Sequence, residues 1–166
     1  MSNPQPSPDP RSRKPRLAGV SLLVAAGGTV LDQAGKALML GQLQPGQVQP
    51  ALPGLLQWRL VENTGAAFSL FHGGVAWLGL ISLLVSLGLV VWLLSRPPRH
   101  PLSAVAWGLL LAGALGNGLD RWFRGAVVDW IELTPISFPV FNLADVAINI
   151  AVALLLLDPL LQRRRP

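Results

Sequence analysis

Carboxylate, amide and cationic side chains occur at helical spacing inside or beside long apolar runs of this sequence. Asp32 and Lys36 are four residues apart, so on a helix they share a face and can neutralise each other. Ionisable groups in such a setting are rare, and each is a candidate functional residue. The set consists of Asp32, Lys36, Asn117, Asp120, Arg121, Asp129, Asn142, Asp145 and Asn149.

The hydrolytic chemistry open to this set is carboxylate chemistry. The chain has no cysteine, and its two histidines, His72 and His100, are far apart, which argues against thiolate catalysis and a zinc site. Two aspartates held close together do not both ionise cheaply, so one keeps a proton while the other is charged. Such a pair can activate water against a carbonyl and protonate its oxygen. Residue chemistry alone leaves a structural cluster or an ion-conducting cluster equally open.

Two groups of three polar residues are each predicted to share one helix face. They are Asn117, Asp120 and Arg121 in the first group and Asn142, Asp145 and Asn149 in the second. Asp129 lies between them in the connection 121–140, whose prolines predict a loop.

Four apolar runs predict an α-helical membrane protein with four transmembrane helices. The composition is 51% hydrophobic and 13% charged, and about 20 apolar residues in a helix cross a hydrocarbon core of roughly 30 Å. The predicted spans are residues 17–30, 75–94, 101–119 and 141–161, within one domain, 17–161. The first run is short and has a basic flank, which also fits a signal peptide.

The distribution of positive charge predicts that both termini are cytoplasmic. Nine Lys and Arg residues flank one side of the four spans and four flank the other, as the positive-inside rule requires. A cleaved signal peptide would put the ends on opposite sides, so this count argues against it. A nucleic-acid-binding patch is disfavoured because the basic residues lie close to span ends. The polar set is then expected at the extracytoplasmic face.

The segments outside the spans are predicted to be two tails and a surface element. The Pro- and Ser-rich segment 1–16 is expected to be disordered, and 162–166 is a basic cytoplasmic tail. The segment 42–72 is expected to form a small extracytoplasmic β-containing element, because apolar and polar residues alternate in 56–60. The sequence "NTG" at 63–65 predicts a turn.

Five blocks, in order along the chain, resemble the signature blocks of the lipoprotein signal peptidases, also called signal peptidase II. They are "LDQAGK" (31–36), "ENTGAAFSL" (62–70), "GNGLDR" (116–121), "GAVVDW" (125–130) and "FNLADVAIN" (141–149). The chain departs from the family pattern at Trp130, where Phe is usual, and at Glu62, where a basic or neutral residue is frequent.

The resemblance implies a bacterial aspartyl endopeptidase of the cytoplasmic (inner) membrane with no metal or organic cofactor. Its substrates would be diacylglyceryl prolipoproteins, cleaved just before the lipidated cysteine at the extracytoplasmic face, and globomycin-type inhibitors would block it. Membrane lipids are the expected surroundings, and no nucleic acid is expected.

The resemblance also implies a role for each residue of the polar set. The implied catalytic dyad is Asp129 with Asp145. The residues implied to position the substrate or the dyad are Asn63, Gly65, Asn117, Arg121 and Asn142, and those implied to support the structure are Asp32, Lys36 and Asp120.

The alternative function is that of a small proton-coupled transporter or channel subunit. Asp32, Asp120 and Asp145 would then form a relay. A relay is expected to have acidic groups near the bilayer midplane and on both sides of it, whereas the predicted spans place these residues at one end. Asp120 as a catalytic residue is also disfavoured, because "GNGLD" differs in spacing from the "GxGD" of other intramembrane aspartyl proteases.

Overall fold

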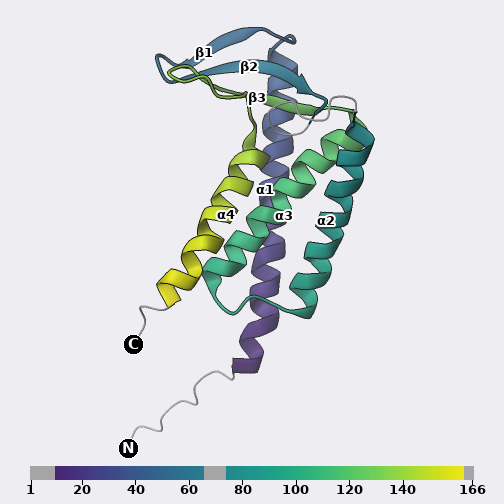
Figure 1. Cartoon of the computed structure of the whole chain (residues 1–166), viewed down its shortest axis with the longest axis vertical. Helices are drawn as coiled ribbons and strands as arrows, with labels where there is room; N and C mark the ends of the chain where they lie inside the picture. Colours follow the sequence, from purple (N-terminus) through teal and green to yellow (C-terminus); the bar gives the residue numbers. More distant parts are fainter. Residues whose placement is uncertain (1–9, 66–73, 163–166) are drawn as a thin grey trace, which may run out of the picture.

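A computed structural model describes residues 10–65 and 74–162, with side chains described for 17–65 and 74–157. The described chain contains four helices and three strands (Figure 1). In chain order they are α1 (Pro10–Gln42), β1 (Val48–Leu52), β2 (Leu56–Asn63), α2 (Val75–Ser95), α3 (Pro101–Phe123), β3 (Val127–Leu133) and α4 (Leu143–Gln162).

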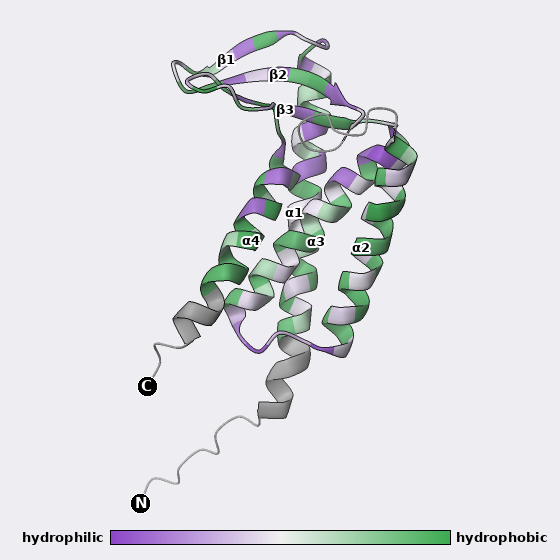
Figure 2. Cartoon of the chain, in the orientation of Figure 1, coloured by the Kyte–Doolittle hydropathy of each residue, from purple (hydrophilic) through white to green (hydrophobic). Residues whose placement is uncertain are grey.

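The helices form a bundle with the sheet at one end (Figure 1). The start of α1, the connection from α2 to α3, and the end of α4 all lie at the opposite end. Within the described residues, three helical stretches are long and apolar enough to cross a membrane, Leu17–Gln42, Val75–Ser95 and Pro101–Phe123, and Leu143–Leu157 is a shorter apolar helix. Figure 2 shows hydrophobic residues along the helices and polar residues gathered near the sheet. The predicted four-helix membrane fold is confirmed.

Helix α1 is longer than the sequence predicts. It continues past the apolar run 17–30 to Gln42 and carries Asp32 and Lys36 within it. Residues 10–16, expected to be disordered, are helical, because extending an existing helix costs much less than nucleating one. The rest of the predicted tail, residues 1–9, and most of the C-terminal tail lie outside the described residues.

Helix α3 is the centre of the bundle and packs against the other three helices. Two of its glycines allow this close approach. A Cβ on Gly108 would lie 2.6 Å from the carbonyl oxygen of Ser21 in α1, and a Cβ on Gly113 would lie 2.6 Å from that of Ala144 in α4. Small residues at helix crossings bring membrane helices together, and here they bring the polar residues of α1, α3 and α4 within hydrogen-bonding distance.

The sheet has the antiparallel order β1-β2-β3. Strand β2 confirms the predicted β-containing element between the first two helices. The prediction of a loop for 121–140 is wrong at Val127–Leu133, which forms β3, and correct for the proline-containing segment that follows. Residues 127–131 are all buried, so the strand has no exposed face and lacks the polar alternation that identifies strands in a sequence.

A hydrophobic core joins the sheet to the end of α1. Met39 of α1, Leu43 directly after α1, Leu60 of β2, and Val128 and Trp130 of β3 are buried together in it. Val128 and Trp130 flank Asp129 in the sequence, so buried neighbours on both sides fix the backbone of this aspartate.

Candidate active site

Asp129 lies on β3, with only 3% of its surface exposed. Its Oδ1 accepts a hydrogen bond from Asn142 Nδ2 at 2.6 Å, and its Oδ2 accepts one from Asn63 Nδ2 at 3.0 Å. Asn63 is on the neighbouring strand, where it pairs with Val127. Strand pairing therefore brings one amide to Asp129, and a residue at the start of α4 brings the other.

Asp145 lies in the first turn of α4, where it forms a reciprocal cap with Asn142. The backbone N–H of Asp145 donates to Asn142 Oδ1 at 3.0 Å, and the backbone N–H of Asn142 donates to Asp145 Oδ2 at 3.1 Å. This is a capping box, which satisfies N–H groups that the helix itself cannot bond. The other carboxylate oxygen, Oδ1, accepts a hydrogen bond from Asn117 Nδ2 at 2.8 Å.

Asn142 connects the two aspartates. Its Oδ1 is held by the helix cap, which turns its Nδ2 toward Asp129 Oδ1 and toward Asn117 Oδ1, 3.0 Å away. Asn117 in turn donates to Asp145. Both aspartates thus belong to one hydrogen-bonded network whose geometry is set by two amide side chains.

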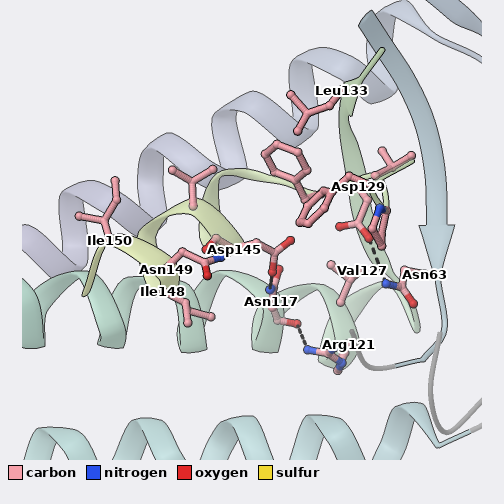
Figure 3. Close-up of a pocket in the computed structure, with 15 residues that line it drawn as sticks. Asn63, Asn117, Arg121, Val127, Asp129, Leu133, Asp145, Ile148, Asn149 and Ile150 are labelled. Atoms are coloured by element: carbon pink, nitrogen blue, oxygen red, sulfur yellow. Dashed lines mark hydrogen bonds between the residues drawn. The ribbon is translucent and has the colours of Figure 1, made fainter. Parts of the chain in front are cut away.

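Both aspartates also line one pocket of about 760 Å³, shown in Figure 3. Its polar part includes Asn63, Asn117 and Arg121. The apolar lining is contributed by β3, the segment before α4, and α4 itself: Val127, Leu133, Phe138, Pro139, Val140, Phe141, Val146, Ile148 and Ile150. An apolar pocket with a few convergent polar groups is typical of a binding site for a small or extended ligand.

The environment of Asp129 favours its protonated form. Burial raises its pKa from the ordinary value of 3.8 to about 7, and the negative charge of Asp145 acts in the same direction. The hydrogen bonds from Asn63 and Asn142 oppose this shift and are outweighed. Asp129 is therefore the member of the pair suited to donate a proton near neutral pH.

A buried ion cluster lies beside the two aspartates of the pocket. Lys36 Nζ is 2.7 Å from Asp32 Oδ2, 2.8 Å from Asp120 Oδ2 and 3.1 Å from Asn117 Oδ1. The two carboxylates and the ammonium group are at most 1% exposed. The three protons of the ammonium group each have an acceptor, as a buried cation requires.

The two carboxylates of this cluster hold the segments that carry Asp129 and Asp145. Asp32 Oδ1 accepts the backbone N–H of Ala144 at 2.9 Å, and Asp120 Oδ2 accepts that of Val128 at 3.1 Å. Val128 directly precedes Asp129 in the sequence, and Ala144 directly precedes Asp145. The cluster thereby fixes the start of α4 and the start of β3 to α1 and α3.

Arg121 links α3 to the predicted turn after β2. Its two terminal nitrogens donate to the carbonyl oxygens of Asn117 and Gly65, each at 3.3 Å. Gly65 N–H donates to Asn63 Oδ1 at 2.9 Å, so the "NTG" turn is confirmed. The turn orients Asn63 so that its Nδ2 faces Asp129.

The structure divides one predicted helix face and adds two residues. Asn117 contacts Lys36 and also lines the pocket, whereas Asp120 contacts Lys36 and Arg121 lines the pocket, because successive residues in a helix are about 100° apart. Gln33 Nε2 and Arg124 NH1 also bond Asp120 Oδ1, at 3.1 and 2.5 Å, and sequence analysis missed both. Their positions in the sequence could have identified them, because Gln33 follows Asp32 and Arg124 is four residues after Asp120.

Two aspartates that share one pocket at the end of a bundle of apolar helices are the arrangement expected of a membrane-embedded aspartic peptidase. Among the described residues, no group of three or more His, Cys, Asp or Glu side chains is placed to hold a metal ion.

Comparisons with known proteins identify the particular family. The family model for signal peptidase (SPase) II matches residues 24–161. The chain is 57% identical over 143 residues to a lipoprotein signal peptidase of Synechococcus sp. (strain RCC307), covering 86% of this chain and 95% of that one. It is 51% identical over 148 residues to the enzyme of the same name from Parasynechococcus marenigrum (strain WH8102), covering 88% and 89%.

A solved structure of a membrane enzyme has the same fold. A bacterial membrane enzyme determined by the in meso method at 2.3 Å resolution superimposes with a TM-score of 0.80 at 30% identity, covering 88% of this chain and 90% of that chain. The chain belongs to the signal peptidase II family and is a multi-pass membrane aspartic peptidase that removes signal peptides from prolipoproteins. The transporter alternative receives no support from these relatives.

Proposed function

We propose that Asp129 and Asp145 are the catalytic dyad and that the enzyme cleaves diacylglyceryl prolipoproteins just before the lipidated cysteine. The observation that supports this most is that Asn142 bonds both aspartates while both line one pocket. Two carboxyl groups held in this way act on the same peptide bond.

In the proposed reaction Asp145 is the general base and Asp129 the general acid. Asp145 takes a proton from water as the water oxygen attacks the scissile carbonyl, and Asp129, whose pKa is raised to about 7, gives its proton to the carbonyl oxygen. The tetrahedral diol then collapses: its carbon–nitrogen bond breaks, the proton on Asp145 passes to the leaving amine, and Asp129 recovers a proton from a hydroxyl group. The products are a signal peptide with a free carboxyl group and a lipoprotein with an amino-terminal cysteine.

The proposed orientation places the sheet and the pocket at the extracytoplasmic face of the cytoplasmic membrane, with both termini in the cytoplasm. The excess of Lys and Arg near the other end of the bundle supports it. In this orientation the acyl chains and the signal helix remain in the bilayer while the scissile bond reaches the dyad at the interface. Globomycin-type inhibitors are expected to occupy the same pocket.

The test is cleavage of a synthetic diacylglyceryl prolipoprotein by purified enzyme in detergent or lipid. Asp129→Asn and Asp145→Asn are each expected to remain folded and to leave the substrate uncleaved, and globomycin is expected to inhibit the wild type. The matched control is Glu132→Gln, three residues along the same strand, whose carboxylate bonds Gln57 and Arg59 and does not line the pocket. Normal cleavage by either aspartate variant would refute the dyad.

A further inference from the structure

Asn149 is the residue of the polar set to which neither the dyad nor the ion cluster gives a role. It is exposed on α4 and lines the pocket one helical turn after Asp145. Its sequence neighbours Ile148 and Ile150 also line the pocket and are apolar. Figure 3 shows Asn149 along α4 between Asp145 and Ile150, so it is a polar group at the apolar end of the site.

One hydrogen bond orients the side chain of Asn149. Its Nδ2 donates to the backbone carbonyl oxygen of Asp145 at 2.9 Å. Within residues 17–65 and 74–157, no donor bonds its Oδ1. The amide thus uses its nitrogen within the helix and leaves its oxygen as an acceptor at the pocket.

The depth of Asn149 makes such an acceptor costly unless a ligand uses it. Four residues of helix correspond to a rise of about 6 Å, so Asn149 lies about 6 Å farther from the sheet end of α4 than Asp145. Polar side chains inside membrane helices are expensive and generally have a partner.

The substrate has groups that need this acceptor. A peptide bond must be in an extended segment to be attacked from the side, so the signal helix unwinds near the scissile bond. Unwound backbone at membrane depth is tolerated only where its N–H and C=O groups find partners. At about 3.3 Å per residue, a 6 Å separation corresponds to about two residues of extended chain.

We propose that Asn149 is a substrate-positioning residue whose Oδ1 accepts a backbone N–H of the signal peptide about two residues before the scissile bond. The inference rests on the proposed dyad, since the position of Asp145 determines which residue of the signal peptide lies opposite Asn149. The hydrogen bond from the peptide backbone to Asn149 is independent of the substrate's side chains. It holds the extended segment against α4.

The experiment compares substrates with single backbone changes. Synthetic lipopeptides carry an amide-to-ester replacement, which removes one N–H, at each of the three positions before the cleavage site. With wild-type enzyme, one ester near the second position is expected to lower kcat/KM about tenfold, the effect of one buried hydrogen bond of roughly 1.4 kcal/mol. With Asn149→Leu, kcat/KM for the all-amide substrate is expected to fall by about the same factor. The ester near the second position is then expected to lower kcat/KM little further.

A double-mutant cycle between the ester replacement and the Asn149 substitution tests the inference. If both changes remove the same hydrogen bond, their effects on the free energy from kcat/KM are not additive. If each ester lowers kcat/KM by the same factor in wild type and Asn149→Leu, the inference is overturned. It is also overturned if Asn149→Leu couples instead to replacement of the glyceryl esters by ethers, which would assign the contact to the lipid. Asn149→Thr, which keeps a side-chain oxygen, is expected to retain more of the ester effect than Asn149→Leu.

Controls separate this inference from the proposed function. Val152→Leu, at an exposed residue of α4 outside the pocket, is expected to match wild type with every ester. If Asn149→Leu accumulates poorly, Asn149→Ala carries the same comparison. Suppose that wild type cleaves the all-amide substrate, that Asp145→Asn does not, and that each ester has the same effect in wild type and in every Asn149 variant. The inference about Asn149 is then overturned, and the proposed function stands. Failure of wild type to cleave overturns both.

Discussion

Lys36 Nζ donates a hydrogen bond to Asn117 Oδ1 at 3.1 Å. Because an ammonium group can only donate, this contact determines which end of the Asn117 amide is the oxygen. The Nδ2 end then faces Asp145 Oδ1, 2.8 Å away. A cation on α1 thus sets the hydrogen bond that α3 makes to an aspartate of α4.

Replacing this cation is expected to damage both stability and activity. Lys36→Met leaves Asp32 and Asp120 buried without their shared counter-ion, which should lower the free energy of unfolding by about 3–5 kcal/mol. Denaturant or thermal unfolding in detergent measures this. Arg59→Met is the control, because the Arg59 side chain is 45% exposed in its pair with Glu132 and its loss should cost less than about 1 kcal/mol. Equal losses would contradict the role of the cluster.

The raised pKa of Asp129 predicts that stability falls as pH rises. A carboxyl group with a pKa of about 7 when folded and 3.8 when unfolded binds more protons in the folded state between these values. The free energy of unfolding therefore decreases as pH rises from about 4 to 7. Melting temperatures across this range should show the decrease in wild type and in Glu132→Gln, and a flatter profile in Asp129→Asn. An unchanged profile in Asp129→Asn would show that another group titrates.

Asn142 is expected to have separable effects on the helix cap and on the dyad. Asn142→Ser keeps a capping oxygen, whereas Asn142→Ala loses it and should cost about 1 kcal/mol of stability. Neither variant can donate to Asp129 Oδ1 as the amide does, so both should lose most of kcat. Unfolding and cleavage measured together check this. Full activity in Asn142→Ser would mean that capping is the whole role.

Close packing of α3 against α4 is expected to set the position of Asp145. In Gly113→Ala, the new Cβ would contact the carbonyl oxygen of Ala144 and the side chain of Ile148, so α4 must move outward. We expect a loss of both melting temperature and cleavage. Gly88→Ala in α2 is the matched control, since its Cβ would have open space, and it should be neutral or stabilising. Equal behaviour of the two variants would exclude a packing role for Gly113.

The proposed orientation can be tested with single cysteines, because the natural chain has none. Gln47, before β1, and Ser95, at the end of α2, are both exposed and lie at opposite ends of the bundle. A membrane-impermeant maleimide added to intact spheroplasts should label Gln47→Cys, and Ser95→Cys only after permeabilisation. The reverse labelling pattern would invert the topology.

The sequence by itself determined the membrane fold and singled out most of the polar residues that the structure brings together. Apolar runs of spanning length follow from the need to bury every backbone polar group in lipid, and polar residues such as Asp32 and Asp145 stand out against them. Helical spacing predicted the pair of Asp32 with Lys36, which the structure confirms at 2.7 Å. These features depend on local periodicity, which a sequence displays directly.

Tertiary structure alone decided how those residues act on one another. Strand β3 was missed because it is buried on both faces, and the rotation of Asp120 toward α1 depends on where α1 packs. The backbone N–H groups before Asp129 and Asp145 are bonded by Asp120 and Asp32, each from a different element. Contacts of this kind join residues far apart in the chain, and packing, which no local pattern records, sets their distances.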